Sequence, residues 1–208
     1  MSESSHIAFF TTSRGIEDLC ARELNEQLSV FASPRPFEMQ GWVQANVNSI
    51  LQLAEICYRA RTIHRGMLLL NAVEIPTARE GLDAIYDAVK MLNLDEWLDR
   101  DVTFAIRSER KGKHAFQSPD IMRVAGQAVI DAVQERYGYR QCVNLDDPDI
   151  ILRVDVAEQW CIISVDFVGE ESLHRRGYRV YHHPAALRST LACAMLMLCN
   201  WKCDKQLV

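Results

Sequence analysis

The chain has 208 residues, of which 49% are hydrophobic and 25% are charged. This composition supports one large domain or two small ones with a real core, and it excludes an intrinsically disordered chain. No apolar run approaches the roughly 18 residues of a membrane span, and the start MSESSHIAFF lacks the basic segment of a secretory signal. Seven cysteines without a CxxC pair favour reduced thiols, so we expect a cytoplasmic protein without a membrane partner.

The net charge of −5 argues against a general nucleic-acid binder, but the charge is unevenly distributed. Residues 1–100 hold nine Lys and Arg against fourteen Asp and Glu, and residues 101–208 hold fourteen against fourteen. The cations of the second half form two clusters. They are Arg107, Arg110, Lys111, Lys113 and Arg123, and then Arg175, Arg176 and Arg179. Local basic patches, more than total charge, attract a polyanion.

Residues 6–75 have the pattern of a split βαβ, or ferredoxin-like, arrangement. In chain order we expect a strand at 6–12, a helix at 16–28, strands at 35–40 and 42–47 that turn at Gly41, a helix at 50–57 and a strand at 64–75. Asn48 or Ser49 is suited to cap the second helix.

A second unit follows Pro76, and it too mixes helices and strands, which makes the fold class α+β (mixed α/β). We expect a helix at 82–92, a strand at 102–110, a basic loop, a helix that begins at Ser118-Pro119, and a hairpin of strands at 149–156 and 159–167. In the second helix Arg123 should face away from the buried side.

The sequence offers little for catalysis or metal binding. It contains no GxGxxG, Walker, GxSxG or HExxH motif, so we predict no catalytic, cofactor-binding or metal site in these residues. Asp146, Asp147 and Asp149 suit either a hard cation or a polar turn before a strand. Cys199 and Cys203 lack a second pair, and the adjacent His182 and His183 should point in opposite directions, so neither pair predicts a metal.

Phosphate binding is the chemistry that remains. In IRSERKGKHAFQSP the cations flank Gly112, His114 and Phe116 can contact a nucleotide, and the following helix adds N-terminal backbone donors. The alternative is a solvated surface loop. In the second cluster, RRGYR, the arginines either contact RNA or belong to a linker and pair with acids such as Glu170 and Glu171.

Three stretches of the chain resemble THUMP-domain RNA methyltransferases. They are FFTTSRGIEDLCARELNEQ, RSERKGKHAFQSPDIMRVAGQAVIDAV and the segment from DDPDIILRV to LCNW. The sequence is most similar to the ribosomal RNA large-subunit guanine-N2 methyltransferase group, often labelled N6-adenine-specific DNA methylases. The resemblance implies a ferredoxin-like domain at 1–75, a THUMP RNA-binding domain at 76–169, and a linker and first helix at 170–208 that lead into the catalytic domain.

The resemblance also implies S-adenosylmethionine as the methyl donor of the full-length protein, although the acidic glycine-rich donor motif and the later catalytic motif of the family are absent here. We therefore expect an inactive N-terminal fragment of a guanine-N2 methyltransferase that captures structured RNA and positions the target base, with 23S rRNA as the first candidate and tRNA as the second. Alternatives are a stand-alone THUMP adaptor that binds tRNA for another enzyme, or a DNA adenine-N6 methylase. The expected RNA contacts are Arg107, Arg110, Lys111, Lys113 and His114, followed by Arg123, Arg175, Arg176 and Arg179.

The final apolar helix, at 185–200, should pack on the missing catalytic domain. Its stripe of Leu187, Leu191, Met195 and Leu198 could also drive weak self-association.

Overall fold

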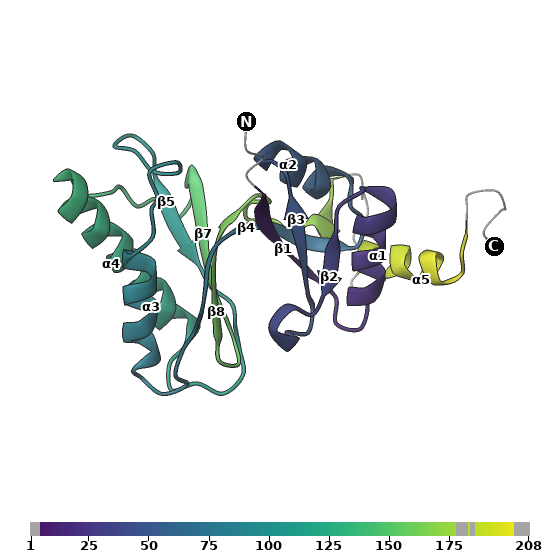
Figure 1. The fold of residues 1–208 in the computed structure, drawn as a ribbon, viewed down its shortest axis with the longest axis horizontal. Helices are drawn as coiled ribbons and strands as arrows, with labels where there is room; N and C mark the ends of the chain where they lie inside the picture. Colours follow the sequence, from purple (N-terminus) through teal and green to yellow (C-terminus); the bar gives the residue numbers. More distant parts are fainter. Residues whose placement is uncertain (1–4, 178–182, 184–185, 202–208) are drawn as a thin grey trace. The chain divides into compact units, whose positions relative to one another are not determined.

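The computed structural model describes residues 5–177, 183 and 186–201, and it divides into two compact units. The first unit comprises residues 1–68 together with 167–208, and the second comprises residues 69–166. Figure 1 shows the chain from its N-terminus in purple to its C-terminus in yellow. Each unit mixes helices with a sheet, as the sequence predicts.

The first unit contains the predicted β-α-β-β-α-β order. Its elements are β1 (His6–Thr12), α1 (Glu17–Gln27), β2 (Ala32–Pro34), the 3₁₀ turn η1 (Pro36–Glu38), β3 (Trp42–Val47), α2 (Ile50–Arg59) and the first part of β4 (Ile63–Glu74). The strands lie in the order β2-β3-β1-β4, and every neighbouring pair is antiparallel. This is the strand order of a ferredoxin-like sheet.

The central position of β1 explains its nearly continuous apolar sequence. Phe9 pairs with Gln44 of β3 on one side and with Met67 of β4 on the other. Ala8, Phe9 and Phe10 are all fully buried, and the Phe9 ring meets the Trp42 ring edge-on at 6.0 Å between centroids. Burial of these side chains supplies much of the unit's stability.

The predicted strand at 35–40 is wrong. The strand ends at Pro34, and Pro36–Glu38 form a 3₁₀ turn in which Arg35 and Phe37 have φ values of 54° and 51°. Glu38 is left-handed as well, with φ 61°, and two prolines without N–H groups and three left-handed residues cannot continue a β-ladder. The pairing closes with the Arg35 N–H, which donates to the Trp42 carbonyl at 2.9 Å.

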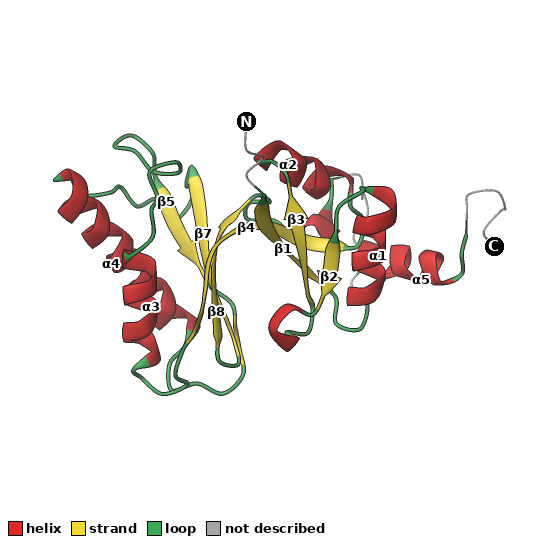
Figure 2. Cartoon of the chain, in the orientation of Figure 1, coloured by secondary structure: helices red, strands yellow, loops and turns green. Residues whose placement is uncertain are grey.

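The second unit places two helices on a small sheet, as Figure 2 shows. Its elements are the end of β4, α3 (Gly81–Lys90), β5 (Phe104–Arg107), β6 (Arg110–Lys111), α4 (Ser118–Tyr137), β7 (Ile150–Ala157) and β8 (Trp160–Asp166). The strand order is β4-β8-β7-β5; β7 and β8 are antiparallel, and β5 and β6 both pair with β7 in parallel. The predicted strand at 102–110 is therefore interrupted after Arg107.

Helix α4 begins where the sequence predicts. Gln117 and Asp120 form a reciprocal capping box, Pro119 occupies the first turn, and the helix ends at Gly138 with φ 76°. The buried face of α4 packs on β5 and β7, and α3 packs beside α4. Arg123 lies on the exposed face, as expected.

The segment after β8 returns to the first unit. It contains the turn η2 (Leu173–Arg175) and helix α5 (Ser189–Leu198), whose Thr190 and Ala194 are buried. The Thr190 hydroxyl hydrogen-bonds the His64 ring at 3.1 Å. Leu187, Met195 and Leu198 are exposed, whereas Leu191 is half-buried. Within the described ranges, no helix is both long enough and apolar enough to cross a membrane.

Candidate RNA-binding surface

The basic loop of the second unit connects β5 and β6 to the N-terminus of α4. Gly112 has φ +103°, and a Cβ at this position would lie 2.9 Å from Oε2 of Glu158. Any other residue would be strained and would crowd that carboxylate, so the tight turn of the loop requires glycine.

Arg110, His114 and Gln117 brace the loop through one connected network. The Arg110 guanidinium donates to the Gly112 carbonyl at 2.7 Å, to Oε1 of Gln117 at 3.0 Å and to Nδ1 of His114 at 3.2 Å. His114 Nε2 then donates to the Glu158 carbonyl at 2.5 Å, a tautomer assigned from this pattern of bonds. Arg110 and His114, both predicted RNA contacts, therefore hold the loop in place and keep few hydrogen-bond donors for RNA.

A buried ion pair fixes the strand from which the loop emerges. Arg153 donates from Nε and Nη2 to both oxygens of Asp155, at 2.9 and 3.0 Å, and both side chains are buried. Asp155 also accepts the Glu109 N–H at 2.7 Å. At Glu109 the backbone N–H therefore donates to the side chain of Asp155 in β7 and not to a backbone carbonyl of that strand. The predicted strand is interrupted at this residue, between β5 and β6.

Lys111 and Lys113 carry the open charges of the loop. Lys113 is exposed and Lys111 is half-buried, and neither ammonium group contacts a carboxylate among the residues described. Ammonium groups held on a braced loop are available to a phosphate at little conformational cost.

Arg107 and Arg123 lie beside a cavity of about 380 Å³ near the start of α4. Its other lining residues are Phe104, Ile106, Met122, Gly126, Val143 and Leu145. The Arg107 guanidinium donates to the Leu145 carbonyl at 2.7 Å, so one side of it is already occupied. Arg123 is exposed.

The second predicted cluster belongs to the first unit, and its members differ in role. Arg175 is exposed in η2. Arg176 donates to the carbonyls of Tyr58 at 2.5 Å, Cys57 at 3.2 Å and Ala60, and thereby caps the C-terminus of α2. This contact supports the bracing alternative for Arg176. Arg179 lies outside the described residues.

Sequence reasoning missed a third group of cations, at the end of α2. Tyr58, Arg59 and Arg61 line a cavity together with Arg176 and Gly177. The signal was present in the sequence: YRAR at 58–61 sets an aromatic residue among arginines, as RRGYR does.

The acidic segment before β7 is a polar turn. The Asn144 side chain accepts the N–H groups of Asp146 and Asp147 at 3.2 Å, and the Asp149 carboxylate accepts both the N–H and the hydroxyl of Thr103. In the described part of the chain, no three His, Cys, Asp or Glu side chains gather as metal ligands would. His182 and Cys203 lie outside that part.

The second unit thus combines a braced cationic loop with a long helix on a mixed α/β sheet, an arrangement suited to a polyanionic ligand. Residues 79–166 match the model of the THUMP domain, and residues 176–208 match the model described as RMKL-like, methyltransferase domain. Together with a 40% identical relative that aligns over 96% of the chain, these matches show that the chain belongs to the THUMP-domain RNA methyltransferase family.

Known relatives agree with this assignment. The chain is 40% identical over 200 residues to the tRNA (guanine(6)-N2)-methyltransferase of Archaeoglobus fulgidus, covering 96% of this chain and 49% of the relative. It is 28% identical over 193 residues to the ribosomal RNA large subunit methyltransferase K/L of Pseudomonas entomophila, covering 93% of this chain and 25% of the relative. The crystal structure of TrmN from Thermus thermophilus superposes with a TM-score of 0.68 at 25% identity, over 94% of this chain and 55% of that one.

The match at 176–208 corrects one expectation. We predicted a fragment that lacks the methyltransferase domain, but residues 176–208 already match the model of that domain. The chain spans about half the length of the Archaeoglobus relative and about a quarter of the Pseudomonas relative. The sequence of the matched segment contains no acidic glycine-rich motif that would hold S-adenosylmethionine, the methyl donor of the family.

Proposed function

We propose that this chain is the RNA-capturing region of an S-adenosylmethionine-dependent methyltransferase that modifies the N2 atom of guanine in tRNA, in the cytoplasm. The observation that carries the proposal is the braced loop with Lys111 and Lys113 open to a phosphate. The choice of tRNA rests on the 40% identity to a tRNA enzyme, against 28% to a ribosomal RNA enzyme. The 23S rRNA is the second candidate substrate.

Phosphate contacts fix the position and orientation of a nucleic acid without reading its sequence. We assign the direct contacts to Lys111, Lys113 and Arg123, and we assign to Arg110 and His114 the role of holding the loop in place. Arg107 and Arg175 are secondary candidates. Domains at 1–75, 76–169 and 170–208 remain our proposed functional division, with 76–169 as the THUMP domain.

The alternatives make different demands on the chain. A stand-alone adaptor has no use for a methyltransferase segment, and the match at 176–208 argues against it. A DNA adenine methylase would favour duplex DNA over structured RNA. Packing of a catalytic domain on α5, weak self-association through Leu187 and Met195, and inactivity of this chain alone stay predictions.

The test is RNA affinity of the double variant Lys111→Glu/Lys113→Glu, measured with a fluorescent unmodified tRNA transcript by anisotropy. Each lost phosphate contact lowers the slope of log affinity against log salt by roughly 0.7–0.9. Two contacts therefore correspond to a slope change of about 1.4–1.8, and to about 25–60-fold weaker binding at 0.1 M salt.

Arg140→Glu is the matched control. Arg140 is exposed and lies just beyond the other end of α4, a 20-residue helix that is about 30 Å long. Arg140→Glu should change affinity less than threefold. Equal affinities of the double variant and the wild-type chain would show that the loop is only a solvated surface. Tighter binding of a matched duplex DNA than of tRNA would favour the DNA methylase.

A further inference from the structure

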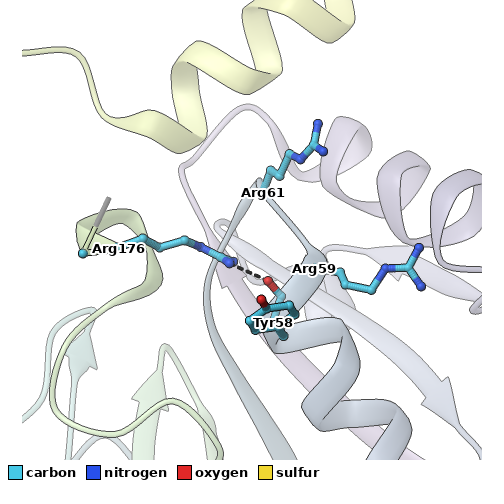
Figure 3. Close-up of a pocket in the computed structure, with 5 residues that line it drawn as sticks. Tyr58, Arg59, Arg61 and Arg176 are labelled. Carbon is cyan, nitrogen blue, oxygen red and sulfur yellow. Dashed lines mark hydrogen bonds between the residues drawn. The ribbon is translucent and has the colours of Figure 1, made fainter. Parts of the chain in front are cut away.

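A second cationic site lies in the first unit, at the C-terminal end of α2. Tyr58, Arg59, Arg61, Arg176 and Gly177 line a cavity of about 760 Å³ there. Figure 3 shows Arg176 reaching the Tyr58 carbonyl from the chain segment after η2, while Arg59 extends from the end of α2 and Arg61 from the turn between α2 and β4. None of these residues belongs to the THUMP match at 79–166.

Contacts within the protein engage these arginines to different degrees. The Arg176 guanidinium donates to three carbonyls at the C-terminal end of α2, where a cation also interacts with the negative end of the helix dipole. Arg59 contacts Glu55 one turn earlier at 2.5 Å, in an exposed pair of the kind that contributes only a few tenths of a kcal/mol. Arg61 is exposed, and its guanidinium contacts no carboxylate or carbonyl in the described ranges.

The backbone that carries Arg61 is nevertheless fixed. The buried Glu23 carboxylate accepts the N–H of Arg61 at 2.9 Å and both the N–H and the hydroxyl of Thr62, at 3.0 and 2.5 Å. A free guanidinium on a pinned backbone binds an anion with a smaller loss of conformational entropy than one on a mobile loop.

Tyr58 adds a flat aromatic surface beside these cations. The residue is 81% exposed, so its ring is accessible to a ligand. Aromatic side chains next to a cationic groove serve as platforms for nucleosides in proteins that bind single-stranded or splayed nucleic acid.

We propose that Arg61 and Arg59 hold a backbone phosphate of the RNA and that Tyr58 packs against the adjoining nucleoside. This second contact rests on the proposed function and extends it, because it gives the ferredoxin-like unit a direct part in gripping the substrate. Arg176 is a positioning residue that joins η2 to the end of α2.

The experiment compares Arg61→Glu, Tyr58→Ala and Tyr58→Phe in the whole 208-residue chain, with the same tRNA transcript. Arg61→Glu should weaken binding about 5–8-fold at 0.1 M salt and lower the salt slope by roughly 0.7–0.9. Tyr58→Ala should weaken binding at least about fivefold, the low end of a stacked base, without changing the slope. Tyr58→Phe keeps the ring and should bind like the wild-type chain.

The loop variant Lys111→Glu/Lys113→Glu separates the two proposals. If it weakens binding while Arg61→Glu and Tyr58→Ala bind as the wild-type chain does, the second site is refuted and the proposed function stands. If all three variants bind normally, both fail. Calorimetry with inorganic phosphate at constant ionic strength tests a free anion as the ligand: heat that Arg61→Glu abolishes, with RNA affinity unchanged, would overturn the assignment to RNA.

Discussion

Replacing Glu23 with alanine should destabilise the first unit through the loop between α2 and β4. Glu23 is a charged residue of α1 that is only 2% exposed, and its carboxylate accepts three hydrogen bonds from Arg61 and Thr62. Thr62 is fully buried, so its N–H and hydroxyl cannot turn to water when the carboxylate is removed. The Arg61 N–H can be hydrated in part, because that residue is exposed.

The magnitude follows from these three donors. A buried donor left without an acceptor costs about 1–3 kcal/mol, and we count the two of Thr62 in full and the Arg61 N–H as nearly free. Glu23→Ala should therefore lower the free energy of unfolding by about 2–6 kcal/mol, or the melting temperature by roughly 4–24 °C. Glu23→Gln retains one acceptor oxygen and should cost about half as much.

Urea unfolding followed by circular dichroism gives the free energies, and hydrogen exchange of the Thr62 amide reports the loop directly. The matched control is Glu26→Ala, an exposed glutamate on the same helix, which should stay within about 0.5 kcal/mol of the wild-type chain. A loss below 1 kcal/mol relative to Glu26→Ala, with unchanged protection of the Thr62 amide, would refute the reasoning.

Two further predictions concern the second unit and the thiols. Asp155→Ala leaves Arg153 buried without its bidentate partner, so it should lower the free energy of unfolding in urea by about 3–5 kcal/mol and weaken RNA binding. Asp155→Asn keeps an acceptor for the Glu109 N–H, so its RNA affinity should lie closer to that of the wild-type chain. Burial raises the pKa of Cys20 and of Cys161 to about 12, so their preference for the neutral form stabilises the fold fully below pH 9 and is lost as the pH rises towards 12. At pH 8 iodoacetamide should modify the exposed Cys142 and Cys199 first, and rapid labelling of Cys20 in peptide mapping would contradict this order.

Much of the fold is encoded by contacts that are local in sequence. The Ser49 hydroxyl caps α2 by accepting the Gln52 N–H, as its position before an apolar helix predicts. Gln117 and Asp120 likewise set the start of α4 within one turn. The strand predicted at 35–40 rests on a hairpin turn at Gly41, and it is wrong because Pro34 and Pro36 end the ladder locally.

The buried glutamates of α1 could not be found in the same way. Glu17 accepts the N–H of Gly41 at 2.7 Å, and Glu23 accepts two N–H groups that lie 38 and 39 residues further along the chain. Helical spacing places both at the edge of the apolar stripe, where a carboxylate ordinarily turns to solvent. Their burial depends on loops that lie 24 to 39 residues from them in the sequence, so no local pattern reveals it.

The same distinction decides which cations are left for RNA. Arg110 is engaged by partners two to seven residues away, so a close reading of the loop could have separated it from Lys111 and Lys113. Arg176 is engaged by carbonyls 116 to 119 residues earlier, and no local pattern reveals that. The long-range contact engages Arg176, whereas the Arg61 guanidinium contacts no carboxylate or carbonyl among the residues that the structure describes. Part of the positive charge that stays open after folding therefore belongs to the YRAR segment, which the sequence does not highlight. Clustered arginines in a sequence therefore predict a binding surface correctly only where the hydrogen-bond partners of those arginines lie close to them in the sequence.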